Sequence, residues 1–105
     1  MDRLERILGG FFGVACGDAL GVTLEFMSRD EAAGTYGNLK DIIGGGYWNL
    51  KPGEVTDDTM MTIAVAEGIL DNPDAPVENI GKRFIEWYDE KPRFIGRIIR
   101  IALNE

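Results

Sequence analysis

Three carboxylates and a threonine lie close together in the middle of the chain, where a helix is predicted to begin. Glu54, Asp57 and Asp58 fall within five residues, and Thr56 lies among them. Residues 52–53, Pro-Gly, mark a turn just before the cluster, and an apolar stretch follows it. Carboxylate and hydroxyl oxygens are the ligands that hard divalent cations prefer. The same residue types also cap ordinary surface helices, so an exposed acidic helix cap is the alternative interpretation.

Which of these two interpretations electrostatics favours depends on whether the cluster lies on an exposed surface or in a cleft. A helix dipole stabilises a nearby anion by roughly 0.3–1 kcal/mol. Two carboxylates about 6 Å apart repel by about 0.7 kcal/mol in water, but by about 3 kcal/mol at an effective dielectric of about 20. On an exposed surface the dipole is therefore sufficient, whereas in a cleft a cation becomes the natural partner.

The cluster belongs to a longer pattern that resembles a known family. Residues 53–61, Gly-Glu-Val-Thr-Asp-Asp-Thr-Met-Met, resemble the Thr-Asp-Asp-Thr signature of the ADP-ribosylglycohydrolase family. Residues 9–21, Gly-Gly-Phe-Phe-Gly-Val-Ala-Cys-Gly-Asp-Ala-Leu-Gly, resemble the opening helix of the same family. The order of the motifs, their separation and the Gly-Gly-Gly loop at 44–46 all fit. The resemblance covers nearly the whole chain and corresponds to the N-terminal part of a typical member.

The resemblance implies an all-α fold, the N-terminal portion of an orthogonal helical bundle. Residues 1–105 are expected to form a single, partial domain. The implied function is that of a hydrolase that removes ADP-ribose from a modified protein side chain or a related acceptor. Family members use two Mg²⁺ or Mn²⁺ ions, which hold the ribose hydroxyls and activate the attacking water. The expected partner is therefore an ADP-ribosylated protein or an ADP-ribose derivative.

The resemblance also assigns roles to individual residues. Thr56, Asp57 and Asp58 would be metal ligands. Glu25, Asp57 and Asp58 would be the catalytic residues, with Glu25 at the mouth of the substrate cleft. The expected substrate-binding residues are Asp18, Gly21, Gly45 and Gly46. From the residues alone, Asp18 fits a surface helix end equally well, and Glu25 fits a solvated loop.

Parts of the family pattern are missing. Residues 92–103 resemble the family's Asp-Ile-Gly-x-Thr-Thr region, but Phe94 replaces the aspartate, and Ile98 and Ile99 replace the threonines. The family's C-terminal Asp-x-Asp-Ser/Thr motif, which supplies the other metal ligands, does not occur in the chain. We therefore expect a half-site in a fragment, in half of a split enzyme, or in an inactive relative. The alternative function is a non-catalytic helical interaction or structural module.

Composition excludes several other chemistries. The chain of 105 residues has 18 acidic and 11 basic residues, a net charge of −7, which argues against nucleic-acid and anionic-membrane partners. It has no histidine, so it cannot supply a Ser-His triad. Its one cysteine, Cys16, lies among small residues and is expected in the core. A single cysteine forms no internal disulfide and fits a reducing, cytoplasmic location.

Periodicity predicts helices over residues 2–20, 28–33, 56–70, 77–88 and 94–103, and no stretch alternates as a strand. The 56–70 helix is expected to be the most buried, through Met60, Ile63, Ala64 and Ile69 or their neighbours. The uncharged segment 7–17 is too short to cross a bilayer.

Four glycines at positions 9, 13, 17 and 21 form one stripe on the first helix and predict a close approach by another helix or a ligand. Tyr47 and Trp48 fit either base stacking or core packing. With part of the family fold missing, apolar faces should be left uncovered. Self-association or a complementary chain is therefore expected.

Overall fold

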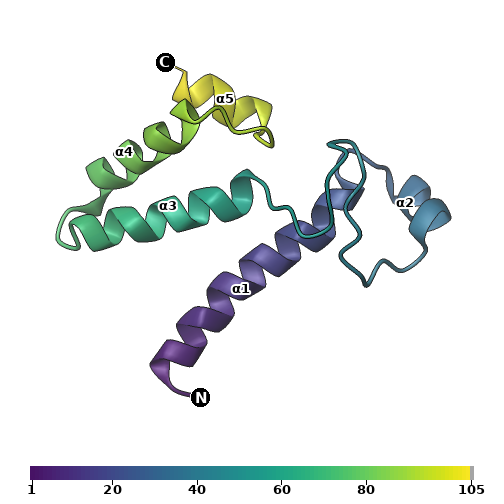
Figure 1. Ribbon diagram of the computed structural model, residues 1–105, viewed down its shortest axis with the longest axis horizontal. Helices are drawn as coiled ribbons and strands as arrows, with labels where there is room; N and C mark the ends of the chain where they lie inside the picture. Colours follow the sequence, from purple (N-terminus) through teal and green to yellow (C-terminus); the bar gives the residue numbers. More distant parts are fainter. Residues whose placement is uncertain (105) are drawn as a thin grey trace. The chain divides into compact units, whose positions relative to one another are not determined.

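The computed structural model describes residues 1–104 and contains only helices as regular elements among them, which confirms the all-α prediction. The chain forms two compact units, residues 1–56 and residues 57–105, and each is described by itself. The first holds α1 (Arg3–Gly21), the short 3-10 helix η1 (Val22–Leu24) and α2 (Arg29–Tyr36). The second holds α3 (Asp57–Asp71), α4 (Pro76–Asp89) and α5 (Arg97–Leu103) (Figure 1). That residues 1–105 form a single domain stays a prediction.

Helix α1 begins with reciprocal capping hydrogen bonds. The Glu5 backbone N–H donates to the Asp2 carboxylate at 2.8 Å, and the Asp2 N–H donates to the Glu5 carboxylate at 2.9 Å. These bonds satisfy two of the amides that a helix start leaves without partners. The helix then runs to Gly21, within one residue of both predicted ends.

The glycine stripe of α1 is open. A Cβ atom built on Gly9, Gly13, Gly17 or Gly21 would meet nothing within 4 Å. Within the first unit, the expected close approach by another helix is therefore absent. Cys16 is exposed rather than in the core, contrary to the sequence prediction.

The segment from Arg3 to Leu24 is long and apolar enough to cross a membrane by length and composition, with a mean hydropathy of 1.7. The sequence prediction that this region is too short to cross a bilayer counted only the uncharged residues 7–17. Core helices of soluble proteins and N-terminal signal sequences have the same properties, so composition alone assigns this helix to none of the three classes.

Helix α2 begins where the capping pattern predicts and ends later. The Glu31 N–H donates to the Ser28 hydroxyl oxygen at 3.1 Å. The predicted end at Gly34 is wrong, because that glycine stays helical. The helix stops at Gly37, whose φ of 65° reverses the chain in the left-handed region that glycine adopts without strain.

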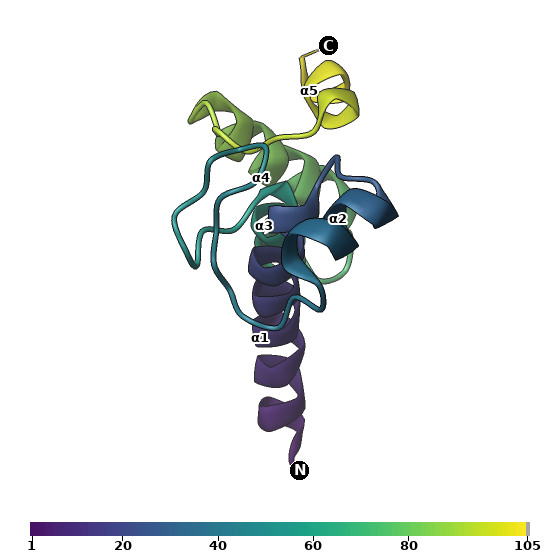
Figure 2. The same cartoon turned by 90° about the vertical axis from the view of Figure 1, so that its right-hand side faces the viewer.

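Helices α3 and α4 form an antiparallel pair that lies side by side in both views (Figures 1 and 2). Helix α3 has three buried residues, Thr59, Ala64 and Gly68, more than any other helix, which confirms it as the most buried. From α4, Trp87 is buried.

The expected core positions of α3 are mostly wrong. Ala64 is buried, but Met60, Ile63 and Ile69 are 36%, 39% and 43% exposed. Met60 and Ile63 line a pocket with Arg83 of α4, so they lie at the edge of the α3–α4 contact rather than inside it.

Arg83 on α4 binds two acidic side chains of α3. Its guanidinium donates to both Asp71 carboxylate oxygens at 2.8 and 2.9 Å, and to Glu67 at 2.9 Å. The Arg83 hydrogen bond lowers the pKa of Asp71 below its usual value of 3.8. The pair therefore stabilises the fold above that value, and this contribution is lost as the pH falls through the lowered pKa.

Gly68 of α3 lies directly against the backbone of Ile80 on α4, and its substitution should be costly. A Cβ at this position would lie 2.6 Å from the backbone of Ile80, so Gly68→Ala has to push the helices apart. We expect a loss of about 1–3 kcal/mol in the free energy of unfolding, measured by urea denaturation. Gly81→Ala on α4 is the matched control, because a Cβ there meets nothing within 4 Å. It should stabilise the helix by up to about 1 kcal/mol. Equal effects of the two substitutions would contradict this packing.

Helix α5 starts at Arg97, three residues later than predicted. Backbone hydrogen bonds to α3 hold the preceding segment in a non-helical conformation. The Asp57 N–H donates to the Phe94 carbonyl at 3.1 Å, and the Gly96 N–H donates to the Asp57 carboxylate at 2.7 Å.

Candidate active site

In the first unit, Asp18 and Thr56 are bound to each other across 38 residues of sequence. The Thr56 N–H donates to one Asp18 carboxylate oxygen at 2.8 Å, and the Thr56 hydroxyl donates to the other at 2.8 Å. Thr56 is buried and Asp18 half-buried. The alternative interpretation, in which Asp18 is an exposed acid at the end of a helix, is therefore wrong. Asp18 fixes the start of the Thr-Asp-Asp-Thr segment against the end of α1.

In the second unit, Asp57 and Asp58 form the first turn of α3. Asp57 is half-buried and accepts the Gly96 N–H, so its carboxylate also orders the segment before α5. Asp58 is exposed. Two carboxylates in the first turn are stabilised by the positive end of the helix dipole. The sequence prediction of an acidic pair at a helix N-terminus is thereby confirmed.

The donor atoms of Thr56, Asp57 and Asp58 are hard oxygens, which suits Mg²⁺ or Mn²⁺ rather than a softer metal. These three residues follow one another in sequence, Thr56 ending the first unit and Asp57 beginning the second. Within residues 1–104, no three Asp, Glu, Cys or His side chains gather as a metal cluster. The donor chemistry fits a hard cation, but the described residues supply only part of a coordination shell.

Glu25 is exposed, just after η1, and its carboxylate accepts the indole N–H of Trp48 at 2.5 Å. A hydrogen bond to a carboxylate oxygen is short and orienting. Glu25 is therefore held by an aromatic side chain from a loop 23 residues further on. The sequence indicated the position of Glu25 but gave no sign of this partner.

The glycine loop packs on η1 and holds Trp48 in place. The Thr23 hydroxyl, fully buried, donates to the Gly44 carbonyl at 2.8 Å. A Cβ on Gly46 would lie 2.6 Å from the Thr23 carbonyl oxygen, so only glycine fits there. Gly45 pairs with Leu50 through two backbone hydrogen bonds of 2.8 and 3.1 Å. The glycines thus shape the loop.

The expected substrate-binding residues fall in different surroundings. Gly45 and Gly46 lie in the loop just described, and Asp18 binds Thr56. Gly21 ends α1 with open space where a Cβ would be. All four belong to the first unit, and their contact with a substrate stays a prediction.

Sequence reasoning missed Phe26 altogether. Its ring centroid lies 4.7 Å from that of Tyr47, which in turn lies 5.1 Å from that of Trp48. Phe26 is 72% and Tyr47 is 69% exposed, so Tyr47 is not a core residue, and Trp48 is half-buried. An exposed phenylalanine next to Glu25 was the only sequence signal available for this cluster.

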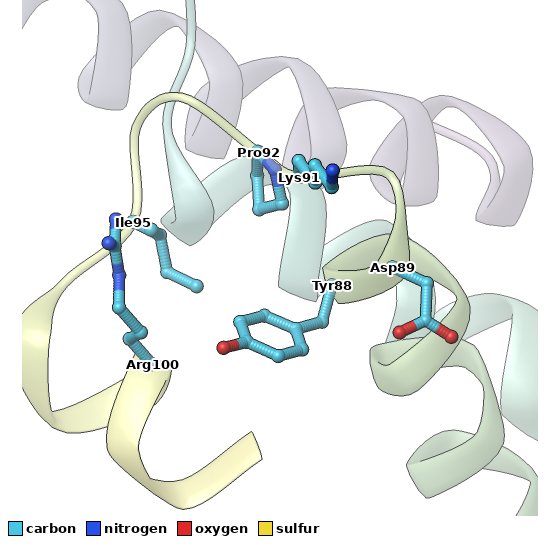
Figure 3. Close-up of a pocket in the computed structure, with 6 residues that line it drawn as sticks. All are labelled: Tyr88, Asp89, Lys91, Pro92, Ile95 and Arg100. Atoms are coloured by element: carbon cyan, nitrogen blue, oxygen red, sulfur yellow. The ribbon is translucent and has the colours of Figure 1, made fainter. Parts of the chain in front are cut away.

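A pocket of about 330 Å³ in the second unit contains none of the predicted site residues. It is lined by Tyr88, Asp89, Lys91, Pro92, Ile95 and Arg100 (Figure 3). The side chains of Tyr88 and Ile95 point toward each other across it, and Asp89 lies on the other side of Tyr88 from Arg100. A mixed lining of this kind shows no convergent set of catalytic groups, so we do not place the active site here.

The family positions that changed type lie in and beside α5. Phe94 contacts α3 through its backbone carbonyl, as described above, and Ile98 is 83% exposed. Where the family pattern has an aspartate, this chain has Phe94, whose backbone carbonyl contacts α3. Where the pattern has a threonine, it has the exposed Ile98.

Substitution of Asp18 tests the contact with Thr56. Asp18→Ala removes the acceptor of both the Thr56 amide and the Thr56 hydroxyl, and Thr56 is buried. We expect a loss of about 2–3 kcal/mol in the free energy of unfolding, because hydrogen bonds to charged groups are worth about 1.5–3 kcal/mol. Hydrogen exchange at the Thr56 amide should accelerate. Asp18→Asn keeps an oxygen acceptor and should lose less. Unchanged exchange in Asp18→Ala would contradict the contact.

The described chain is all-α, with a Thr-Asp-Asp sequence at the start of α3 and an aspartate of α1 bound to that threonine. The family model described as ADP-ribosylglycohydrolase matches residues 1–105, the full chain. The chain therefore belongs to the ADP-ribosylglycohydrolase family.

Three characterised relatives show the extent of the likeness. The ADP-ribosyl-[dinitrogen reductase] glycohydrolase of Rhodospirillum rubrum is 41% identical over 100 residues, which is 95% of this chain and 34% of the relative. The ADP-ribosylarginine hydrolases of Serratia proteamaculans and Pseudomonas putida are 36% and 35% identical over 87 residues, 83% of this chain and 22% of each relative. The chain thus spans about a third or less of the length of these relatives.

Proposed function

We propose that this chain carries the N-terminal half-site of a metal-dependent hydrolase that removes ADP-ribose from a modified arginine side chain. One observation carries the proposal: Asp18 holds Thr56 by two hydrogen bonds immediately before the Asp57–Asp58 pair. The arginine acceptor is suggested by the relatives, two of which are named as ADP-ribosylarginine hydrolases.

Thr56, Asp57 and Asp58 are the residues that would hold Mg²⁺ or Mn²⁺. When bound, a divalent cation supplies positive charge that orients hydroxyl groups and makes water a better nucleophile. The chain's own residues have separate tasks. Asp18 holds Thr56 in position, and Asp57 ties α3 to the segment before α5. For Glu25, whose carboxylate accepts the Trp48 N–H, the proposed task is to accept or give a proton.

The proposed reaction consumes one water molecule. The bond between the ribose anomeric carbon and the guanidinium nitrogen breaks, and a bond from that carbon to the water oxygen forms. One water proton goes to a carboxylate, for which we propose Glu25. The carboxylate passes this proton to the leaving nitrogen, so the products are ADP-ribose, with a hydroxyl group on its anomeric carbon, and free arginine. No oxidant or second substrate is needed.

The test uses the chain in two forms. Residues 1–105 alone are incubated with ADP-ribosylarginine and Mg²⁺ or Mn²⁺, and released ADP-ribose is measured. In a chimera, the same residues replace the matched segment of the Rhodospirillum rubrum glycohydrolase, so that the remaining two-thirds of that relative complete the protein. We expect metal-dependent release by the chimera. For residues 1–105 alone we expect weak metal binding at best, because tight sites need most ligands in place.

Three outcomes would contradict the proposal. A folded chimera without activity would favour the alternative function, a non-catalytic helical module. Release of ADP-ribose by the chimera in the presence of a chelator would contradict the metal dependence. Sub-micromolar metal binding by residues 1–105 alone would show that the half-site is a complete one.

A further inference from the structure

The aromatic cluster Phe26, Tyr47 and Trp48 enters the site described above only through the Trp48 N–H that Glu25 accepts. Aromatic side chains bury large areas in most folds, and here two of the three rings are more than two-thirds exposed. The Phe26–Tyr47 and Tyr47–Trp48 pairs are edge-to-face, with interplanar angles of 72° and 87°. The rings therefore present surfaces in several directions rather than one flat stack.

The loop that presents the cluster is tightly fixed. The Asn49 N–H donates to the Gly46 carbonyl at 3.1 Å, which places Tyr47 and Trp48 at the two central positions of a tight turn. Asn49 adopts a φ of 52° and Gly46 a φ of 70°, and the turn sits on the buried Thr23. Phe26 also adopts a left-handed φ, 65°, which is strained for a non-glycine residue. Strain of this kind persists where the surrounding structure holds it, and it is frequent at ligand sites.

A negative charge lies at the edge of the cluster. Glu25 receives the Trp48 indole N–H, a neutral donor, and forms no ion pair within residues 1–104. Aromatic faces attract cations through the ring quadrupole, and a carboxylate beside them adds to that attraction. The same charge repels the diphosphate of ADP-ribose. Of the two ends of an ADP-ribosylarginine, this cluster therefore suits the cationic end.

We infer that Phe26, Tyr47 and Trp48, together with Glu25, bind the guanidinium group of the modified arginine. This inference rests on the proposed function and extends it to the acceptor side of the substrate. A guanidinium is planar, stays charged at neutral pH and stacks on aromatic faces. Trp48 has a second role in this arrangement, because its N–H orients the carboxylate that faces the cation.

The test measures binding of methylguanidinium to residues 1–105 by NMR, without metal and without hydrolysis. The indole N–H resonance of Trp48, assigned by its loss in Trp48→Phe, should shift saturably at millimolar concentration. Urea has the same planar shape and no charge, so it should cause no comparable shift. Tyr47→Leu, Phe26→Leu and Glu25→Gln should each weaken methylguanidinium binding by about threefold, the effect of one exposed cation–π or ionic contact. Phe12→Leu, an exposed aromatic on α1, is the matched control and should leave it unchanged.

Several results would overturn the inference. The first is a shift by urea equal to that by methylguanidinium, and the second is no saturable shift at all. The third is a saturable shift by adenosine with no response to methylguanidinium, which would make the cluster a base-stacking site. The outcomes stay separate from those of the hydrolysis assay. An active chimera whose cluster does not bind methylguanidinium refutes this inference alone. Saturable binding with an inactive chimera refutes the hydrolase function and leaves the guanidinium site.

Discussion

Asp58→Asn is expected to lower the rate of ADP-ribose release by the chimera at least a hundredfold. The carboxylate is exposed in the first turn of α3 and is a proposed metal ligand. Losing an ionic ligand removes electrostatic stabilisation worth several kcal/mol, and each 1.36 kcal/mol is a factor of ten in rate. Because the side chain is exposed, the free energy of unfolding should change by less than about 0.5 kcal/mol.

Asp57→Asn should lose both activity and stability, which distinguishes it from Asp58→Asn. The Asp57 carboxylate accepts the Gly96 N–H at 2.7 Å, a charge-assisted bond that asparagine replaces with a weaker one. We expect a comparable loss of rate and a decrease of about 1 kcal/mol in the free energy of unfolding, measured by urea denaturation.

Asp30→Asn is the matched control for both substitutions. Asp30 is exposed in the first turn of α2, so it shares the helix position of the pair without the proposed metal role. It should leave the rate of the chimera unchanged. Full activity of Asp58→Asn with normal metal dependence would remove Asp58 from the site.

Local sequence signals predicted the helices well because each helix start has its own chemistry. The Ser28–Glu31 spacing predicted the start of α2 to within one residue, and the cap forms. The start of α1 was also predicted to within one residue, and the structure adds the Asp2–Glu5 cap. Ends depended on longer-range contacts. Gly34 looked like a helix end, but the left-handed residue is Gly37.

The start of α5 shows the same limit. Periodicity placed it at Phe94, yet Asp57 binds both Phe94 and Gly96 from 37 and 39 residues away and keeps that segment non-helical. No local pattern encodes a contact of that range.

The site was predicted in residue type rather than in arrangement. The motif indicated Thr56, Asp57 and Asp58, and the structure adds that Asp18 binds Thr56. The contact between Glu25 and Trp48 could not be predicted, because nothing in either neighbourhood indicates the other. Phe26 was missed since a single exposed phenylalanine has no periodicity.

Burial was the least predictable property. Apolar periodicity assigned Met60, Ile63 and Ile69 to a core, but periodicity shows only which side of a helix is apolar. What covers that side is decided by other elements, and the periodicity of one helix carries no information about them. Cys16 was likewise assigned to a core because small residues surround it in sequence, and its side chain is exposed.

Residues 1–105 alone are expected to self-associate in solution. Helix α1 exposes a row of large apolar side chains, among them Leu4 at 64%, Ile7 at 48%, Leu8 at 47% and Phe12 at 67%. In the second unit, Leu70 and Val77 are 80% and 81% exposed. Leaving roughly 500 Å² of such surface in water costs about 12 kcal/mol relative to burying it. That is comparable to the whole stability of a small domain, and soluble monomers rarely expose larger patches.

Size-exclusion chromatography with light scattering measures the association directly. We expect a mass above that of the 11.6 kDa chain, which decreases with dilution. Phe12→Glu places a charge in the apolar row of α1 and should shift the chain toward the monomer. Asn38→Glu adds the same charge at an exposed loop position and should not, which separates the loss of apolar contact from a general increase in repulsion.

The net charge of −7 slows association but supplies no core, so it does not alter the expected direction. The chimera gives the complementary result: if the remaining segment of the relative covers the apolar row, Phe12→Glu should destabilise the chimera rather than dissociate it. A compact monomer of residues 1–105 with cooperative unfolding above about 60 °C, beyond most mesophile domains, would contradict this expectation. The exposed apolar faces would then be compatible with a stable, independent fold.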